Sequence, residues 1–389
     1  MRNTVIPFRY DTQETVYPSV DTAIQQLCPD IPTYTLDRSL ITSLGRNFMV
    51  QFPGRSLFAV KTNPHEAVIQ SLMQGGIRDF DVASLAEIEL VRRASHDSNL
   101  YYMHTVKSPE MIERAYCDYG VRTFALDHMD ELNKILEATG YAEDLSLFVR
   151  IALPKNAHAA IDFSDKFGAH YTDAITLLRT VRKHTNRLGL CFHVGTQIED
   201  ASSFGNAINH VKRLIHDSGI TLEMLDVGGG FPVFYDRDVP NISNCIDVIN
   251  TALKHAGLDH LELLAEPGRC LVAEAGSLVV RVELRRDDLL YINDGTYGGL
   301  FDAGPLLNTA FPMTAHRLKG TFSKELKPYR LAGPTCDSLD MMTGPYLLPE
   351  DIRMGDYIEI RNIGAYSYAL RSGFNGFGES QTVFIDPKT

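Results

Sequence analysis

The sequence predicts a (β/α)8 barrel followed by a β domain, and three observations lead to this prediction. Short apolar runs alternate with amphipathic helical patterns eight times within about 210 residues, which is the usual size of such a barrel. From residue 277 onward helical patterns are few and strand-like runs dominate. The total of 389 residues suits one large and one smaller domain. A doubly wound parallel sheet is the competing arrangement for the first part.

The eight expected barrel strands are short, mostly apolar runs of the kind that a parallel sheet buries on both faces. They are Leu57–Thr62, Phe80–Ser84, Leu100–His104, Thr123–Asp127, Leu147–Leu153, Leu188–Gly195, Met224–Gly228 and Leu261–Glu266.

Two helix starts within this repeat have capping signals. Asn63 can cap a helix, Pro64 suits its first position, and Glu66 lies three residues after the cap, as in a capping box. Ser84 and Glu87 repeat the same spacing before the next helix. Both starts follow directly on a predicted strand.

The β domain is predicted from three segments. Residues 31–37 form a short strand near the N-terminus, and residues 277–294 contain two strands joined by a charged turn. Residues 356–367 form another strand-like run with a glycine turn. We therefore expect the N-terminal strand to join this domain.

The composition argues against several kinds of partner and is compatible with a small cationic substrate. A net charge of −12 argues against nucleic acid or an anionic membrane as the main partner. No stretch approaches the roughly 18 apolar residues of a membrane span, and the N-terminus lacks the apolar core of a signal peptide. The six cysteines are scattered without a Cys-x-x-Cys pair, which fits free thiols and no metal site. We expect a cytoplasmic protein.

Lys61 ends the first predicted strand, in the segment "SLFAVKTNP". In α/β barrels the carboxyl ends of the strands carry the active site. A lysine beside apolar walls there is partly desolvated, which lowers its pKa and frees the amine as a nucleophile. An ordinary lysine whose ammonium reaches solvent fits this segment equally well.

Other polar residues follow the later strands, so a barrel would gather them on the same face. In order they are Asp81, Arg150, His193, Gly228-Gly229-Gly230, Glu266 and Arg269. Successive glycines let backbone N–H groups approach a phosphate, and Arg269 adds a charged fork. His193 can present its ring to a planar ligand, and Glu266 can hold a proton on a ring nitrogen. Each residue alone also fits a structural role, and their coincidence favours a site.

An amine nucleophile, a phosphate cradle, a ring-stacking group and an acid for a ring nitrogen together describe a pyridoxal 5'-phosphate site. This cofactor attaches to a lysine as a Schiff base, and a carboxylate partners its pyridinium nitrogen. The protonated ring can then accept electrons from a carbanion at the substrate Cα. The sequence thus predicts pyridoxal 5'-phosphate as the cofactor.

Eight motifs occur in order: "FAVKTN", "DFDVASLAEIELV", "FHVGTQ", "LDVGGGFP", "EPGR", "GPTCDSLD", "NIGAYS" and "GFNGF". With them the sequence resembles the fold-type III pyridoxal phosphate decarboxylases of basic amino acids, the ornithine, lysine and diaminopimelate decarboxylase superfamily. The resemblance covers about residue 30 to about residue 380. It implies the barrel and a C-terminal β domain.

The resemblance also implies a role for each matching residue. Lys61 would hold the cofactor, Glu266 would pair with the ring nitrogen, and His193 would stack on the pyridine ring. Asp81 matches an acidic position of the family, and Arg150 is expected in the same cofactor site from its place at a strand end. The phosphate would be bound by Thr196, Gly228, Gly229, Gly230, Gly268, Arg269 and Tyr366.

Domain bounds and assembly follow from the same resemblance. The barrel would cover residues 37–268, and the β domain would combine residues 1–36 with residues 269–389. Members of this family work as head-to-tail homodimers with shared active sites. Lys166 and Asp340 would then form an ion pair across the interface.

The substrate site would come partly from the partner chain. Cys336 would protonate the substrate Cα, Asp337 would hold the distal ammonium, and Phe374 would lie near the substrate. Diaminopimelate decarboxylases have Cys-Glu at this motif, so Cys336-Asp337 favours a simple diamino acid. Asp302, in "YGGLFDAG", would be a second carboxylate for the ammonium. The loop there is shorter than in eukaryotic ornithine decarboxylases, so the role of Asp302 stays open.

The expected reaction is the decarboxylation of L-ornithine to putrescine in polyamine biosynthesis, with lysine to cadaverine as well. Ornithine and lysine differ by one methylene, worth only about 1–3 kcal/mol in a pocket. Diaminopimelate, a carboxylated polyamine and a siderophore precursor are alternative substrates. A non-catalytic homologue that acts as a binding protein is a further alternative. An alanine-racemase-like isomerase would be expected to have an arginine in place of Glu266.

Overall fold

The computed structural model describes residues 15–155, 159–161 and 166–387. The chain forms two compact units, one of residues 39–274 and one that combines residues 1–38 with residues 275–389. Among the described residues, no helix is both long enough and apolar enough to cross a membrane.

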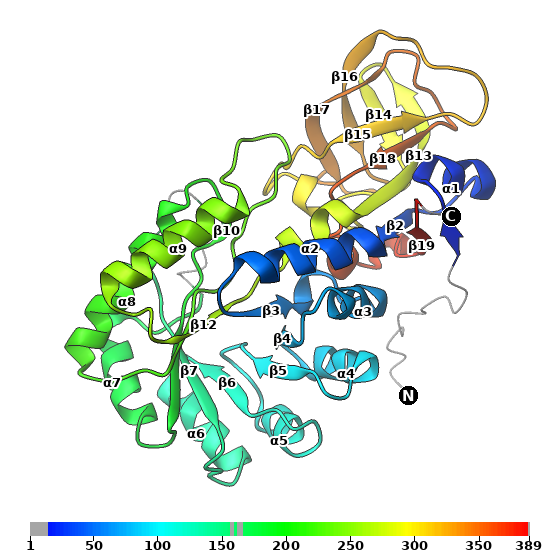
Figure 1. The fold of residues 1–389 in the computed structure, drawn as a ribbon. Coiled ribbons are helices and arrows are strands. Elements are labelled where there is room, and N and C mark those ends of the chain that lie inside the picture. The colour runs from blue at the N-terminus through cyan, green and yellow to red at the C-terminus, as the bar shows by residue number, and fades with distance from the viewer. Residues whose placement is uncertain (1–14, 156–158, 162–165, 388–389) are drawn as a thin grey trace. The chain divides into compact units, whose positions relative to one another are not determined.

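The first unit is a closed barrel of parallel strands with helices around it (Figure 1). Its order around the barrel is β3-β4-β5-β6-β7-β9-β11-β12, and β12 pairs with β3 to close it. The strands are β3 (Arg55–Ala59), β4 (Asp79–Val82), β5 (Asn99–Tyr102), β6 (Thr123–Leu126), β7 (Ser146–Arg150), β9 (Arg187–Cys191), β11 (Met224–Asp226) and β12 (Glu262–Ala265). The predicted (β/α)8 barrel is confirmed, and the doubly wound sheet is excluded by the closure.

Amphipathic helices connect these strands and bury their apolar faces on the barrel. They are α2 (Arg38–Gln51), α3 (Glu66–Gln74), α4 (Leu85–Ala94), α5 (Pro109–Cys117), α6 (Met129–Ala138), α7 (Tyr171–Val181), α8 (Ser202–Ser218), α9 (Ile242–Ala256) and the short α10 (Arg269–Val272). A small antiparallel pair, β8 (Ala159–Ile161) and β10 (Thr196–Ile198), joins two of the connecting loops.

Inside the barrel, inward-pointing side chains from successive strands fill the space. A core cluster of buried residues consists of Leu57, Met103, Ala125, Phe148, Cys191, Met224 and Leu264. Gly189 lies opposite the largest of them, because a Cβ there would stand 2.3 Å from the Phe148 ring. The barrel interior is therefore packed with side chains, so a ligand would bind at the loops that follow the strands.

The second unit contains a mixed sheet in the order β1-β19-β2-β13-β14-β16-β17, with β18 paired to β13 and β15 paired to β18. Its strands are β1 (Val16–Tyr17), β2 (Thr33–Asp37), β13 (Gly276–Arg286), β14 (Leu289–Ile292), β15 (Met313–His316), β16 (Leu326–Ala332), β17 (Met341–Pro349), β18 (Tyr357–Ile360) and β19 (Gln381–Ile385). One α-helix, α1 (Val20–Leu27), precedes β2 in the chain. The three predicted strand segments are present as β2, the β13–β14 hairpin and β18.

The first strand ends earlier than predicted, and this corrects the placement of Lys61. β3 stops at Ala59, and residues Val60–Thr62 form a single 3-10 turn that Asn63 closes by donating its N–H to the Val60 carbonyl at 3.1 Å. Val60 is fully buried although it lies in the turn. An uninterrupted apolar run does not distinguish a buried strand from a buried turn, because it has no alternation of apolar and polar residues. The sequence pattern therefore extended the strand too far.

The cap of the following helix was also predicted wrongly. α3 begins at Glu66, and its N-cap is His65, whose Nδ1 accepts the Ala67 N–H at 3.2 Å. The cap predicted one helix later is confirmed, because the Ser84 hydroxyl accepts the Glu87 N–H at 3.3 Å. The Glu87 carboxylate reaches back to the Ala83 N–H at 2.7 Å, so the capping box is closed one residue upstream of the cap.

Candidate functional site

Lys61 and Asp81 meet where β3 and β4 end. The Lys61 Nζ lies 3.5 Å from Asp81 Oδ2, and the Asp81 side chain is only 5% exposed. The Lys61 side chain is 47% exposed, so its amine reaches the open mouth of the barrel instead of an apolar interior. An amine held by a buried carboxylate yet accessible from outside can react with a carbonyl compound that enters there.

Three glycines after β11 let the backbone approach its neighbours closely. Gly228 and Gly230 have φ values of +69° and +102°, a region that favours glycine. A Cβ on Gly229 would stand 2.7 Å from the Glu266 carbonyl and 3.1 Å from His193 Nε2. No side chain fits at these positions, so the loop presents bare backbone beside His193.

The His193 ring is oriented by a local hydrogen bond. Its Nδ1 accepts the N–H of Gly195 at 3.1 Å, so the neutral ring carries its proton on Nε2. Burial lowers the pKa of His193 well below its usual range, and the positive charges of Arg150 and Lys61 lower it further. A neutral aromatic ring is therefore available to pack against a flat ligand.

Glu266 and Asp226 form a buried pair of carboxyl groups at the ends of β12 and β11. Burial raises the pKa of Asp226 to about 7, and burial together with Asp226 raises that of Glu266 well above its usual range. Asp226 Oδ1 accepts the Gly228 N–H at 2.8 Å, and the Glu266 side chain is near enough to affect the pKa of Asp226. Two neighbouring carboxyls of this kind retain a proton more readily than isolated ones, because both cannot ionise without strong repulsion. A ligand that brings a protonated nitrogen can take the place of that proton.

Further charged groups surround these residues. Burial raises the pKa of Glu87 to about 7, although its hydrogen bond from the Ala83 N–H acts in the opposite direction. Arg150, the last residue of β7, places its guanidinium 5.0 Å from the centre of the Phe167 ring. The His104 ring meets the same Phe167 edge-on at 5.6 Å. Lys61 lies near enough to affect the pKa of both Glu87 and His104.

The Arg269 guanidinium is held by a tyrosine. Arg269 begins α10 and is only 8% exposed, and its Nη1 donates to the Tyr235 hydroxyl at 3.0 Å. Gly268 precedes it, and a Cβ there would stand 2.2 Å from the Thr62 hydroxyl. Arg269 is therefore a fixed positive group on the turn that follows Glu266.

These residues fit pyridoxal phosphate. A bare glycine loop and a fixed arginine suit its phosphate, and a buried carboxyl pair suits its pyridinium nitrogen. The barrel unit contains Lys61, Asp81, Arg150, His193, Thr196, Gly228, Gly229, Gly230, Glu266, Gly268 and Arg269, each on or after the carboxyl end of a barrel strand. Their roles on the cofactor stay predictions.

In the second unit, Asp337 and Phe374 come together around Tyr297. The Tyr297 hydroxyl donates to Asp337 Oδ2 at 2.5 Å, and its ring centre lies 4.7 Å from that of Phe374. Cys336 is exposed, and its backbone N–H donates to Asn375 Oδ1 at 3.1 Å. The hydrogen bond from Tyr297 lowers the pKa of Asp337, so this carboxyl is ionised at neutral pH. We call these five residues the Asp337 cluster.

Tyr366 and Asp302 are two further predicted site residues of the second unit. Tyr366 has a φ of +54°, a constrained conformation for a tyrosine. Asp302 is 6% exposed within the short 3-10 turn Phe301–Ala303. The roles of both residues in the site also stay predictions.

Asp340 is a buried hydrogen-bond acceptor within the second unit. It is 1% exposed, and its carboxylate accepts hydrogen bonds from the N–H and hydroxyl groups of both Thr296 and Thr335, at 2.7–3.1 Å. Lys166 places its Nζ 4.8 Å from the centre of the Phe167 ring. The interface ion pair between Lys166 and Asp340 stays a prediction.

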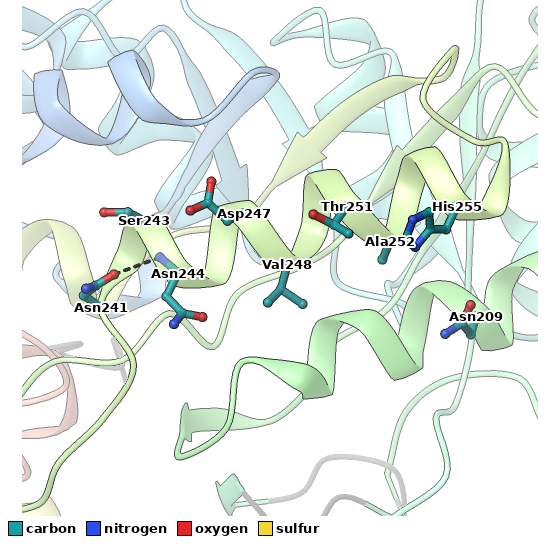
Figure 2. Close-up of a pocket in the computed structure, with 9 residues that line it drawn as sticks. All are labelled: Asn209, Asn241, Ser243, Asn244, Asp247, Val248, Thr251, Ala252 and His255. Atoms are coloured by element: carbon teal, nitrogen blue, oxygen red, sulfur yellow. Dashed lines mark hydrogen bonds between the residues drawn. The ribbon is translucent and has the colours of Figure 1, made fainter.

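A cavity of about 590 Å³ lies away from these residues, on the outer surface of the barrel between α8 and α9 (Figure 2). It is lined by Asn209, Asn241, Ser243, Asn244, Asp247, Val248, Thr251, Ala252 and His255. Figure 2 shows the hydrogen bond by which Asn241 caps α9, from the Asn244 N–H at 2.8 Å. The polar side chains are exposed helix surface, so this groove brings together no reactive set.

Sequence reasoning missed three residues that hold the predicted ones in place. Asp226 and Tyr297 stand inside segments already singled out, "LDVGGGFP" and "YGGLFDAG", and its position at a strand end marks Asp226. Tyr235 follows the glycine loop by five residues. Its contact with Arg269 joins two distant segments, so no local pattern reveals it.

Comparison with known proteins agrees with this geometry. Residues 39–273 match the family model described as "Pyridoxal-dependent decarboxylase, pyridoxal binding domain". A lysine/ornithine decarboxylase of Selenomonas ruminantium is 30% identical over 93% of this chain and 92% of its own length.

Two solved structures are similar over nearly the whole chain. The arginine decarboxylase of Paramecium bursaria Chlorella virus, bound to agmatine, has a TM-score of 0.82 at 27% identity and covers 94% of this chain and 99% of its own. The lysine/ornithine decarboxylase of Vibrio vulnificus, complexed with putrescine, has a TM-score of 0.79 at 32% identity. It covers 95% of this chain and 99% of its own. The chain belongs to the fold-type III, pyridoxal phosphate-dependent decarboxylases of basic amino acids.

Proposed function

We propose that this decarboxylase converts L-ornithine to putrescine, and L-lysine to cadaverine at a lower rate. The observation that carries the proposal is the Asp337 carboxylate, which Tyr297 holds at 2.5 Å beside the Phe374 ring. An ionised carboxylate next to an aromatic wall suits an ammonium group at the end of an apolar chain. A substrate that bears a second carboxylate at this end would be repelled by the same group.

Bound pyridoxal phosphate supplies a protonated pyridine ring that accepts the electrons left at the substrate Cα when CO2 departs. In the proposal, Lys61 is the covalent attachment point, and Glu266 holds the proton on the ring nitrogen with Asp226 behind it. His193 covers one face of the ring. Asp81 orients the Lys61 amine through their 3.5 Å contact.

The phosphate of the cofactor would be bound by several groups at once. They are the backbone N–H groups of Gly228, Gly229 and Gly230, the side chains of Thr196, Arg269 and Tyr366, and the turn at Gly268. Arg150 adds positive charge at the mouth of the barrel. Together these groups would offset the negative charge of the phosphate.

The substrate end of the site would require two chains. The substrate carboxylate would rest against a poorly solvated wall, where the loss of its charge as CO2 is favourable. Cys336 of the partner subunit would deliver a proton to Cα, and Asp337 of the partner subunit would hold the distal ammonium. Asp302 and Phe374 would complete the pocket. We therefore propose a cytoplasmic homodimer with shared sites, which acts in polyamine biosynthesis.

A competition assay tests the substrate. The protein is incubated with pyridoxal phosphate and equal amounts of ornithine, lysine, arginine and diaminopimelate, and the amines formed are quantified by mass spectrometry. Putrescine should lead, with a preference over cadaverine within about 10–200-fold, because one methylene separates the substrates. Lys61→Ala is the matched inactive control.

Other outcomes decide between the alternatives. Agmatine or cadaverine as the leading product would overturn the ornithine assignment while keeping the reaction. A protein that binds the cofactor through Lys61 but decarboxylates none of the four amino acids would indicate a carboxylated polyamine substrate or a binding role. Unchanged turnover and product in Cys336→Ala would exclude the proton donor.

A further inference from the structure

A buried ion pair lies close to the Asp337 cluster and is used by none of the steps above. The side chains of Arg371 and Asp294 are 6% and 2% exposed, and Arg371 Nη2 donates to Asp294 Oδ2. Asp294 also accepts the backbone N–H of Gly295 at 2.9 Å and of Gly299 at 3.2 Å. In the described part of the chain, the Nε and Nη1 of Arg371 are buried without a hydrogen-bond partner.

Such a pair is a poor source of stability. Removing two charges from water is costly, and the cost is recovered only when every donor and acceptor is satisfied. Arg371 leaves two nitrogens unsatisfied, so an apolar pair of similar volume would serve the fold as well. Stability alone therefore does not explain the pair. Its two residues lie next to the segments that carry Tyr297 and Phe374, which suggests another role.

Asp294 fixes the loop that carries Tyr297. The loop wraps around the carboxylate so closely that a Cβ on Gly298 would stand 1.7 Å from Asp294 Oδ1. Tyr297 projects from this loop and donates its hydroxyl to Asp337. A shift of the loop would therefore move the phenol that holds the Asp337 carboxylate.

Arg371 fixes the segment that carries Phe374. The next residue, Ser372, donates both its N–H and its hydroxyl to the Tyr297 carbonyl, at 2.9 and 2.8 Å. Phe374 then stacks against the Tyr297 ring. The ion pair thus joins two segments, and each segment presents one of the two rings.

We propose that the Arg371–Asp294 pair is a positioning device that sets Tyr297 and Phe374 against Asp337, and thereby sets the affinity for the distal ammonium of the substrate. This inference rests on the proposed function, since it assumes that Asp337 holds that ammonium. Neither Arg371 nor Asp294 touches the substrate in this proposal.

The same unit offers a matched control. Arg317 is 7% exposed and pairs with Asp356, 4% exposed, at 2.8 Å. Its other hydrogen bonds in the described residues go to Asp351 and to the Thr321 carbonyl, outside the Asp337 cluster. Arg317→Met removes a buried guanidinium of the same kind without disturbing the rings.

The test compares Arg371→Met with Arg317→Met as holoenzymes. Arg371→Met should raise KM for the diamino acid by about 10-fold or more, because hydrogen bonds to a charged group typically contribute about 1.5–3 kcal/mol. The value of kcat should change much less, and the absorbance of the bound cofactor should stay the same. Arg317→Met should lower the unfolding temperature and leave KM unchanged.

Asp294→Asn is a second, milder variant, since its amide oxygen can still accept the Gly295 and Gly299 N–H groups. It should also raise KM, and the double variant with Arg371→Met should raise KM no further, because both changes break the same contact. Additive effects of the two substitutions would contradict the proposal. Restoration of KM by Arg371→Lys, which keeps the charge, would support it.

Hydrogen exchange separates this proposal from the proposed function. Backbone exchange should rise in peptides that cover residues 294–299 and 372–377 of Arg371→Met and stay at the wild-type level in Arg317→Met. If no diamino acid is decarboxylated but exchange rises, the substrate assignment fails and the positioning role stands. If the enzyme is active and neither exchange nor KM changes, the positioning role is wrong.

Discussion

Asp226 and Glu266 are two neighbouring carboxyl groups at the barrel mouth whose pKa values are raised. Asp226 is fully buried and Glu266 partly buried at neighbouring strand ends, and burial raises the pKa of each. A carboxyl with a raised pKa favours the folded state only while it is protonated. Its contribution to stability is therefore present below the ordinary value of 3.8 and is lost as the pH rises towards 7.

Asp226→Asn should flatten this dependence in the cofactor-free protein. The wild-type protein should lose stability between about pH 4 and pH 7, and the variant should lose less, with a difference of roughly 1–4 kcal/mol at pH 7.5. Urea unfolding across this range measures it. Asp288→Asn is the control, since the hydrogen bond from Arg330 lowers the pKa of Asp288 and places its titration below the window. Parallel curves for wild type and Asp226→Asn would contradict the raised pKa of Asp226.

Tyr235 fixes the position of the Arg269 side chain by accepting a hydrogen bond from it. Tyr235→Phe keeps the ring and removes only the hydroxyl 3.0 Å from Arg269 Nη1. Pyridoxal phosphate should then bind about 10-fold more weakly, because a buried charged group loses one hydrogen bond. Equilibrium binding of pyridoxal without its phosphate is the control and should be unaffected. An equal loss for both compounds would mean that Tyr235 supports the barrel and not the phosphate site.

At the scale of elements, His316 ties two elements of the second unit to its own strand. On β15, its Nδ1 lies 3.1 Å from Asp21 of α1 and its Nε2 lies 3.3 Å from Glu359 of β18. Burial lowers the pKa of His316, but the hydrogen bonds to the two carboxylates outweigh it, so the pKa is raised above 6.5. The protonated ring then bridges α1 and β18.

A raised histidine pKa gives stability that is fully present below pH 6.5 and is lost as the pH rises through the folded-state value. His316→Gln should therefore destabilise the protein more at pH 5.5 than at pH 9, by on the order of 1 kcal/mol. Thermal unfolding at the two pH values measures this difference. Asp21→Asn leaves one carboxylate and should give an intermediate result. A pH-independent loss would mean that the ring acts only by packing.

The cap of α4 is a second element-scale feature, and it can be tested without reference to activity. Ser84→Ala removes the acceptor of the Glu87 N–H at 3.3 Å and should destabilise the protein by about 1 kcal/mol. Ser84→Asp should restore most of that loss. Chemical denaturation measures both variants. No loss in Ser84→Ala would show that the Glu87 contact to Ala83 is sufficient to hold the helix start.

At the scale of the whole molecule, the proposed site combines the barrel of one chain with the Asp337 cluster of another. Lys61→Ala and Cys336→Ala should each be nearly inactive alone. Mixed and allowed to exchange subunits, they should recover about a quarter of wild-type activity, because half of the dimers are mixed and each mixed dimer has one intact site. The specific activity of equimolar mixtures measures this. No recovery despite verified subunit exchange would indicate that each site is built from one chain.

The fold was predictable because it follows from local patterns. Eight strand–helix repeats fix a barrel of this size, and the polar residues at the strand ends then had to converge, since parallel strands all point the same way. The end of β3 was not predictable, since Val60 is as apolar in its turn as it would be in a strand. The His65 cap was missed because Asn63 and Pro64 gave a stronger local signal.

The sequence by itself determined the barrel and the cofactor, and it predicted a set of site residues, because each stands in a short motif with its own physical reason. Only the tertiary structure decided how these residues are supported. The mutual effect of Asp226 and Glu266 on their pKa values, the hydrogen bond from Arg269 to Tyr235, the hydrogen bond from Tyr297 to Asp337, and the Arg371–Asp294 ion pair all link segments far apart in the chain. Such contacts depend on where the chain folds back on itself, which no local pattern records.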